Sequence, residues 1–287
     1  MSRLAGKNAI VTGASRGVGV YIARALAEQG VNLVLSARSL EPLAQLASEL
    51  SRGGVRVVPV QGDIALAADR ERLLQQAQAE LGSIDILVNN AALEINAAFS
   101  ALAPEEIAAT VELDLLAPML LTRGLLPGML DRRHGHVVNI ASLAGKSATP
   151  YNVAYSAAKA GLVLFTHSLY SELAGTGVRA SVIVPGFITQ TGMYAAKERD
   201  HGADVTPLVG TSKPEHVAAA VMRALRTGRL EIIVAPGPMR LAQAFNQLFP
   251  VVFAWFVKLI GAMEPFRRVA IGTGRDMPGR ADQTGRD

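Results

Sequence analysis

Cysteine is absent from this chain, and its absence excludes several kinds of chemistry. Without thiols there can be no disulfide bond, no thiolate metal site and no cysteine nucleophile. Histidine is scarce too. His134 and His136 flank a single glycine before a predicted strand, which is a turn pattern, and the other three stand alone: His167, His201 and His216. None of these spacings is typical of metal ligands, so we expect no metal site.

A strong excess of charge is also lacking. The 287 residues include 28 basic and 24 acidic side chains, a net charge of +4, and residues 238–287 account for +3 of it (seven basic minus four acidic). The main body has neither a basic stripe nor a motif that reads nucleic acid, so we expect no nucleic-acid partner. No apolar leader precedes the first glycine-rich turn, which makes a cytoplasmic location the simplest expectation.

Hydrophobic residues make up 50% of the chain, and their arrangement predicts the fold. Short runs rich in Val and Ile alternate with longer runs rich in Ala and Leu, as in repeated strand–helix–strand units. We predict an α/β fold: a Rossmann-like, doubly wound parallel sheet of seven strands with helices on both faces. The expected strands are 9–11, 32–36, 56–60, 84–89, 136–140, 179–184 and 231–235. The expected helices are 18–29, 40–50, 67–81, 104–130 with an interruption near Pro118, 151–174 and 214–226.

The first predicted strand leads into a glycine-rich turn, Thr12-Gly13-Ala14-Ser15-Arg16-Gly17-Val18-Gly19, and then into a helix. Gly13 would permit a tight turn, Gly17 would let the backbone approach a pyrophosphate, and Gly19 would allow close helix–strand packing. Free amides at the helix start would meet the anion. Such a turn alone is a weak indication of a dinucleotide site. The contacts expected from it are those of Gly13, Ser15, Arg16, Gly17, Val18 and Gly19.

The form of this turn, TGxxxGxG, resembles the short-chain dehydrogenase/reductase family, and the resemblance continues from about Lys7 to about Ala235. It implies transfer of a hydride between a nicotinamide cofactor and a carbonyl or alcohol. The resemblance also implies further cofactor contacts, from Asp63 and Ile64 at the adenine, from Asn90 and Ala91, and from Pro185, Gly186 and Ile188 at the nicotinamide. Asn89 is expected to be structural.

The end of the second predicted strand bears on the choice of cofactor. In the family an acidic residue there usually binds the ribose hydroxyls of NAD, whereas this chain has Ser36-Ala37-Arg38-Ser39. No acid is present to repel a 2′-phosphate, and Arg16 and Arg38 are both placed to contact one. We therefore expect NADP(H) to be preferred over NAD(H). The alternative is that both arginines are simply exposed surface charges.

Three residues carry the predicted chemistry. Tyr155 and Lys159 are four positions apart on a predicted helix and so share one helix face, and Ser142 lies thirteen positions before Tyr155, just after the fifth strand. The resemblance implies that Tyr155 exchanges the proton and also contacts the cofactor. It further implies that Lys159 binds the cofactor ribose and that Ser142 holds the substrate oxygen. We expect the charge of Lys159 to lower the pKa of the phenol.

Two positions depart from the family pattern. Asp114 stands where the family usually has an asparagine that holds a relay water, so it is either a modified catalytic relay residue or a sign of weakened catalysis. Gln190 stands where the family usually has a threonine that contacts the nicotinamide carboxamide, and Thr189 or Thr191 could take its place.

The C-terminal part suggests how substrate is held. Residues 193–209 are expected to form a mobile cover, and Glu94, Tyr151, Phe187 and Tyr194 either line the substrate pocket or are ordinary packing residues. Residues 241–263 read as one helix that is apolar nearly all round. Three interpretations of this helix remain open: a subunit interface or lid over an apolar substrate, a peripheral membrane attachment, or core packing.

The sequence thus predicts a dinucleotide-binding and catalytic domain at residues 1–237, an apolar helical extension at 238–276 and a disordered tail at 277–287. The expected function is NADP(H)-dependent oxidation or reduction of a hydrophobic ketone or alcohol, such as a steroid, an acyl chain or another lipid. The expected assembly is a homodimer or homotetramer. The alternative is a non-catalytic nucleotide-binding or membrane-associated protein that retains the scaffold.

Overall fold

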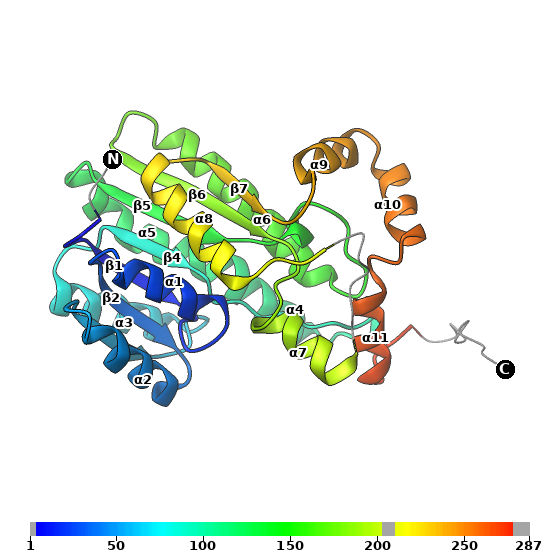
Figure 1. Cartoon of the computed structure of the whole chain (residues 1–287), viewed down its shortest axis with the longest axis horizontal. Coiled ribbons are helices and arrows are strands. Elements are labelled where there is room, and N and C mark those ends of the chain that lie inside the picture. Colours follow the sequence, from blue (N-terminus) through cyan, green and yellow to red (C-terminus); the bar gives the residue numbers. More distant parts are fainter. Residues whose placement is uncertain (1–3, 203–209, 278–287) are drawn as a thin grey trace.

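The computed structural model describes residues 4–202 and 210–277 and contains the predicted sheet (Figure 1). Its seven strands are Asn8–Thr12 (β1), Asn32–Ala37 (β2), Val57–Gln61 (β3), Ile86–Asn89 (β4), Gly135–Ile140 (β5), Val178–Pro185 (β6) and Glu231–Val234 (β7). They are all parallel, in the order β3-β2-β1-β4-β5-β6-β7. The prediction of a doubly wound, Rossmann-like sheet is confirmed.

Helices cover both faces of the sheet (Figure 1). One face carries α1 (Val18–Ala27), α2 (Leu40–Ser51) and α8 (Pro214–Thr227), and the other carries α3 (Ala67–Leu81), α5 (Ala117–Asp131) and α6 (Val153–Glu172). Neighbouring strand residues point into opposite cores: Val11 packs in the first and Ile10 in the second, each fully buried. Burial of both faces explains why the strands read as continuous apolar runs rather than alternating ones.

The strand order places the site. The chain winds outward from β1 in both directions, so the order reverses between β1 and β4. In such sheets a crevice forms outside the carboxyl ends of the strands at this reversal, and ligands bind there. Strands β1, β4, β5 and β6 end at this edge, at Thr12, Asn89, Ile140 and Pro185 respectively.

The predicted interruption near Pro118 is a π-helical segment, η2 (Glu112–Leu116), between α4 (Pro104–Val111) and α5. Pro118 has no N–H, so it cannot donate to the carbonyl four residues back, and the N–H of Ala117 donates five residues back to Glu112. Residues 104–131 are long and apolar enough to cross a membrane by composition. However, Ala117, Leu121 and Met129 are fully buried against the sheet, which makes this a core helix.

The prediction of one helix over residues 241–263 is wrong. The extension instead has three helices, α9 (Met239–Leu248), α10 (Pro250–Leu259) and α11 (Glu264–Gly272). Phe249 leaves the helical region (φ −134°, ψ 62°), as residues before proline tend to do. Gly261, with φ +67°, follows the end of α10. α7 (Gly192–His201) begins the segment expected to be a cover, whereas 203–209 and the tail after Met277 lie outside the described residues.

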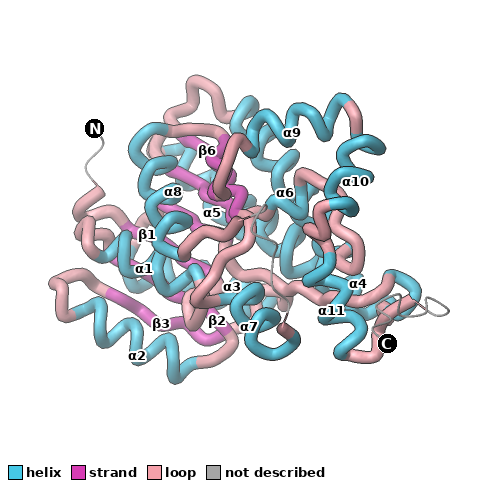
Figure 2. Tube along the Cα trace, turned by 45° about the vertical axis from the view of Figure 1, so that its right-hand side comes forward, coloured by secondary structure: helices cyan, strands magenta, loops and turns pink. Residues whose placement is uncertain are grey.

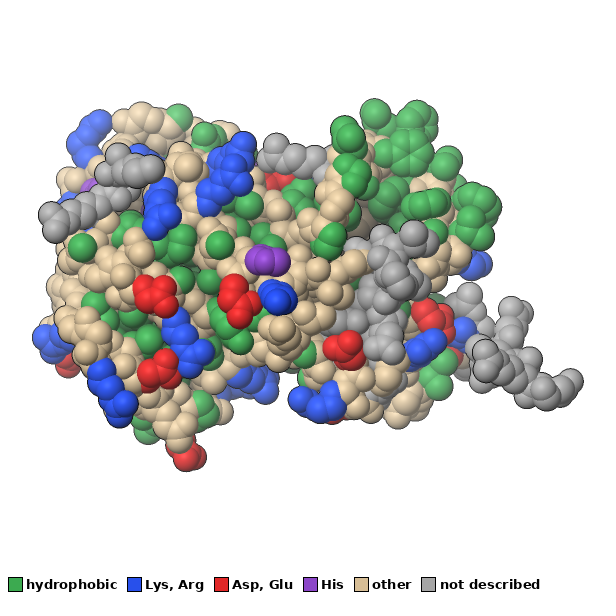
Figure 3. Space-filling model, in the orientation of Figure 1, with side chains coloured by type: hydrophobic (Ala, Val, Ile, Leu, Met, Phe, Trp, Pro, Cys, Tyr) green, Lys and Arg blue, Asp and Glu red, His purple; other side chains and the backbone are tan. Residues whose placement is uncertain are grey.

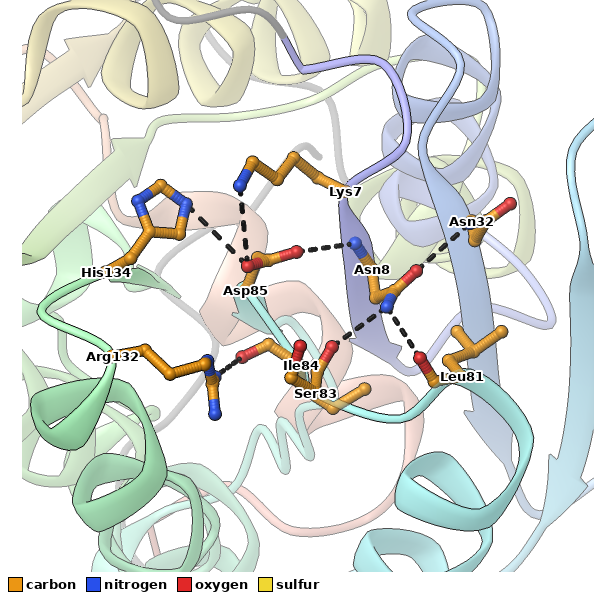
Figure 4. A network of polar contacts seen from close by, with 9 residues as sticks. All are labelled: Lys7, Asn8, Asn32, Leu81, Ser83, Ile84, Asp85, Arg132 and His134. Atoms are coloured by element: carbon orange, nitrogen blue, oxygen red, sulfur yellow. Dashed lines mark hydrogen bonds and ion pairs between the residues drawn. The ribbon is translucent and has the colours of Figure 1, made fainter.

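The opposite edge of the sheet is closed by a polar network around Asp85 (Figure 4). Asp85 is buried, and its carboxylate accepts a hydrogen bond from the backbone N–H of Asn8 (3.0 Å). Lys7 and His134 each lie 3.7 Å from the other carboxylate oxygen. The Asn8 side chain donates to the carbonyl oxygens of Leu81 and Ser83. The start of β1 is thereby tied to the segment that leads into β4.

We expect Asp85→Ala to lower the free energy of unfolding by about 1–3 kcal/mol, because it leaves the Asn8 amide without its acceptor in a buried place. Urea denaturation followed by circular dichroism measures this loss. Asp131→Ala, an exposed carboxylate at the end of α5, is the matched control and should leave stability nearly unchanged. If the two variants unfolded at the same urea concentration, Asp85 would not have the stabilising role assigned to it.

Candidate active site

The glycine-rich turn after β1 forms a cradle that a side chain would fill. A Cβ added to Gly13 would lie 2.7 Å from the Cα of Ala91, and one added to Gly19 would collide with the carbonyl oxygen of Gly13. The Asn90 side chain braces the turn by donating to the carbonyl oxygens of Thr12 (2.9 Å) and Gly13 (3.2 Å). Asn90 and Ala91 therefore lie against the turn, as expected of residues beside a cofactor.

Helix α1 starts without a side-chain cap. Gly17 is its N-cap residue, with φ 64°, and no side chain in the described part of the chain caps the first turn, which begins at Val18. Free amides at a helix start are the kind of donor that a pyrophosphate anion accepts from. A Cβ on Gly17 would lie 3.4 Å from the Cα of Gly192, so the start of α7 faces the turn across the same crevice. Half-buried Ser15 lies within the turn.

Arg16 and Arg38 are exposed, and in the part of the chain described here neither guanidinium has an ion-pair or hydrogen-bond partner. Arg38 follows directly after β2, and its carbonyl oxygen accepts a hydrogen bond from Gln61 at the end of β3. Asp63 accepts a hydrogen bond from the N–H of Ala65 (3.0 Å), and Ile64 is buried beside it. The glycine cradle, the uncapped helix and the two unpaired cations fit a phosphorylated dinucleotide.

Tyr155, Lys159 and Ser142 come together at the carboxyl end of β5. Tyr155 and Lys159 are both buried on α6, and the Lys159 Nζ lies 5.5 Å from the centroid of the Tyr155 ring. The Nζ donates to the carbonyl oxygen of Ile140 (3.2 Å), the last residue of β5. The Ser142 hydroxyl lies close enough to the Tyr155 phenol to lower the pKa of that phenol. The Ser142 hydroxyl also accepts from the N–H of Ala144 (3.1 Å), which fixes its position.

The effect on the phenol is the reverse of the expected one. Burial raises the pKa of Tyr155 well above its ordinary value of 10.0, and the charges of Glu94 and Asp114 raise it further, against the opposing effect of Ser142. The ammonium of Lys159 also lies 3.8 Å from the carboxylate of Asp114, so two anions oppose its field at the phenol. In this arrangement the phenol holds its proton firmly at neutral pH.

Asp114 is fully buried in the π-helical segment η2, and its carboxylate lies 3.8 Å from the Lys159 Nζ. Its Oδ1 accepts a hydrogen bond from the N–H of Leu93 (2.9 Å), and its Oδ2 has no hydrogen-bond partner among residues 4–202 and 210–277. Burial raises the pKa of Asp114 from 3.8 to about 6, against the opposing effects of Lys159 and the Leu93 amide. The departure from the family asparagine thus puts a second ionisable group beside Lys159.

The sequence did not decide whether Glu94 lines the pocket or is an ordinary packing residue, and the structure places it at the candidate site. Its carboxylate accepts a hydrogen bond from the side chain of Asn152 (2.5 Å), the residue that precedes α6. Its charge acts on both Tyr155 and Asp114. The acid lies five residues after the end of β4, and this short spacing at the carboxyl edge of the sheet was the available indication.

The loop after β6 places the residues expected at the nicotinamide. Gly186 donates its N–H to the carbonyl oxygen of Val234 (3.0 Å), and Ile188 is buried in a bridge with Ser212. Pro185 is the buried last residue of β6. Gln190 is exposed with φ 69°, and the Thr189 hydroxyl donates to the carbonyl oxygen of Ser212 (3.4 Å). These contacts do not decide which of Thr189, Gln190 and Thr191 would contact the nicotinamide carboxamide, so that assignment stays a prediction.

A cavity of about 480 Å³ opens beside Glu94. Its lining combines the segment after β4 with α4, α7 and α11: Glu94, Ile95, Asn96, Glu106, Met193, Ala196, Asp200, Val269, Thr273 and Arg275. Arg275 forms an ion pair with Glu106 (3.0 Å between Nη1 and Oε1). The extension therefore supplies one wall of the pocket, which the sequence did not reveal.

The other residues expected to line the pocket pack under that wall. Phe187 contacts Phe266 of α11, with ring centroids 5.7 Å apart. Tyr151 is buried in the same apolar cluster and has φ 61°. For Tyr151 and Phe187 the structure therefore agrees with the interpretation as ordinary packing residues. The side chain of Tyr194 lies outside the described residues.

We expect Asp114→Asn to change how stability depends on pH. Because the folded protein binds the Asp114 proton more tightly than the unfolded chain, the carboxyl group adds stability as the pH falls from about 6 to 3.8. Asparagine cannot titrate. The difference in unfolding free energy, wild type minus variant, should therefore rise as the pH falls, with a slope approaching roughly 1.4 kcal/mol per pH unit. Urea titrations over this range measure it, and a constant difference would rule out the raised pKa.

Known proteins share this architecture. The short chain dehydrogenase family matches residues 7–202. The ketoacyl reductase HetN of Nostoc sp. is 42% identical over 265 residues, which cover 89% of this chain and 91% of that protein. A 3-oxoacyl-acyl-carrier-protein reductase of Synechocystis sp. is 33% identical over 222 residues, covering 77% of this chain and 90% of that protein.

Solved structures agree. A variant of actinorhodin polyketide ketoreductase with NADPH superposes with a TM-score of 0.74 at 32% identity, covering 82% of this chain and 98% of that one. A metagenomic short-chain oxidoreductase in complex with NADP gives a TM-score of 0.68 at 31% identity, covering 82% of this chain and 100% of that one. Together with the cofactor cradle and the Ser142–Tyr155–Lys159 group, these similarities establish that the chain belongs to the short-chain dehydrogenase/reductase family of oxidoreductases.

Proposed function

We propose that the chain is an NADP(H)-dependent reductase that converts a keto group on an acyl chain, or on a similarly apolar substrate, to an alcohol. The observation that carries this proposal is the burial of Tyr155 and Lys159 together, with Nζ 5.5 Å from the ring centroid, next to Ser142 and to Glu94, which lines the pocket. The non-catalytic alternative gives no reason for burying Lys159 and Tyr155 together at the end of β5.

The chemistry divides between cofactor and chain. A bound NADPH would supply the hydride that reaches the carbonyl carbon. Ser142 would hold the carbonyl oxygen, and the Tyr155 hydroxyl would donate its proton to that oxygen as negative charge develops. A phenol is protonated at neutral pH, so Tyr155 would carry the proton that this step consumes. Lys159, held by Ile140 and Asp114, would contact the cofactor ribose.

The preference for NADP(H) over NAD(H) is supported by two exposed arginines without partners beside the glycine cradle. Arg38 would contact the 2′-phosphate from the end of β2, and Arg16 would contact it from the turn. Two of the solved structures similar to this chain, the actinorhodin ketoreductase variant and the metagenomic oxidoreductase, contain NADPH and NADP, respectively.

The substrate class is supported by the relatives and by the pocket lining. HetN is named a ketoacyl reductase, and the Synechocystis sp. relative acts on a 3-oxoacyl group carried by a protein. In this chain Ile95, Met193, Ala196 and Val269 provide apolar surface along the cavity, which suits an acyl chain. Residues 238–276 would thus complete the catalytic domain of residues 1–237 rather than stand apart from it.

We further propose a homodimer or homotetramer in a cytoplasmic setting. Leu116 and Leu120 at the start of α5, and Leu164 and Tyr170 on α6, are large apolar side chains that are 39–67% exposed. Two neighbouring helices with such side chains on their outer face favour contact with another copy.

The cofactor proposal predicts that Arg38→Ala weakens NADPH binding by at least roughly tenfold and leaves NADH binding unchanged, because only NADPH carries the 2′-phosphate. Titration of the purified protein followed by nicotinamide fluorescence measures both affinities. Arg52→Ala removes an equal charge from an exposed site at the end of α2 and should have no effect. Equal losses for both cofactors would show that Arg38 does not read the phosphate.

The reaction proposal predicts that Tyr155→Phe loses roughly 10²–10⁴-fold in turnover of 3-oxoacyl model substrates and still binds NADPH. NADPH absorbance measures turnover, and nicotinamide fluorescence measures binding. Tyr170→Phe removes a hydroxyl from an exposed position on the same helix and should be fully active. If Tyr155→Phe retains activity, Tyr155 is not the proton donor.

A further inference from the structure

Helices α9 and α10 carry an unusual amount of exposed apolar surface. Of the 22 large hydrophobic residues that are exposed among those described, nine lie between residues 239 and 259. They are Leu241, Phe245, Leu248, Phe249, Val251, Val252, Trp255, Phe256 and Leu259. We call residues 239–259 the apolar projection. Figures 1 and 2 show it at the end of the molecule away from α2 and β3, and Figure 3 shows apolar side chains gathered over it.

The projection is anchored on one side and bare on the other. Gln243 of α9 is buried, and Asn246 donates to the carbonyl oxygen of Lys146 in the loop after β5 (2.9 Å). Leu241, Phe245 and Leu248 lie at helical spacing on the outer side of α9. The Asn246 hydrogen bond and the burial of Gln243 therefore hold α9 to the body, and its apolar stripe is left for a partner.

Helix α10 presents a second row of exposed apolar side chains. Val251, Trp255 and Leu259 follow one another at four-residue spacing and are 81%, 64% and 65% exposed. At ten residues, α10 is about 15 Å long, half the thickness of a bilayer core, so it cannot span a membrane. A short helix of this composition is suited to lie in the plane of a membrane surface.

The charges favour a membrane over a second copy of the chain. Between Pro238 and Met263 there are two basic residues, Arg240 and Lys258, and no acidic residue. Two copies joined through α10 would enclose the exposed Lys258 of each copy without an acidic counter-charge from residues 239–259. Anionic lipid head groups would supply that charge, and the indole of Trp255 is a side chain typical of the membrane interface.

We propose that the apolar projection docks the protein on the surface of an anionic lipid bilayer. The next helix, α11, lines the substrate pocket with Val269 and Thr273, so docking would hold that pocket close to the lipid. The benefit for an acyl substrate rests on the proposed function. The docking itself does not, because it needs neither cofactor nor turnover.

Trp255 is the single tryptophan of the chain, so tryptophan fluorescence reports on the apolar projection alone. We expect its emission to shift to shorter wavelength when the full-length protein meets vesicles of equimolar phosphatidylcholine and phosphatidylglycerol, and to shift less with phosphatidylcholine alone. Brominated lipid should quench it. Unchanged emission together with no co-sedimentation would overturn the proposal.

Variants separate docking from self-association. Val251→Ser with Leu259→Ser should lower vesicle affinity by at least roughly tenfold, because both exposed side chains lose their apolar contact with lipid. NADPH binding and oligomeric state should be unchanged. Leu66→Ser, at a residue 59% exposed before α3, is the control and should bind vesicles normally. If the double variant instead dissociates the oligomer and retains vesicle affinity, the surface joins copies and the proposal is wrong.

Discussion

The Lys159 side chain is buried, and the candidate active site is arranged so that polar groups surround its ammonium. A buried ammonium requires polar partners, and among the described residues it donates to the carbonyl oxygen of Ile140 at 3.2 Å and forms an ion pair with the carboxylate of Asp114 at 3.8 Å. These contacts join α6, β5 and the π-helical segment η2 at one point. Tyr155, one helical turn before Lys159, is thereby placed beside Ser142 and Glu94.

The fold could be predicted from the sequence because burial on both faces leaves a strong local pattern. Each strand reads as a short run of branched apolar residues, and parallel pairing follows from the long helices between them. The extension could not be predicted in the same way. Its apolar residues fit one long helix, and the break depends on Phe249 preceding Pro250 and on Gly261, whose effects are decided by local geometry.

The candidate site shows the same division. Gly13, Gly19, Tyr155 and Lys159 belong to motifs whose spacing alone indicates their neighbours. The pKa of Tyr155 could not be read from spacing, because it depends on burial and on Glu94, a residue brought in by the end of a different strand. The wall formed by α11 depends on long-range contacts such as Arg275 with Glu106, 169 residues apart in the chain.

The approach of Gly192 to Gly17 has a kinetic consequence. The first residue of α7 faces the phosphate turn, and the same helix lines the pocket with Met193, Ala196 and Asp200. One helix therefore borders both the phosphate turn and the pocket. In the proposed reductase, a dinucleotide held at the turn would lie next to the start of the helix that lines the pocket, which favours binding of the cofactor before the substrate.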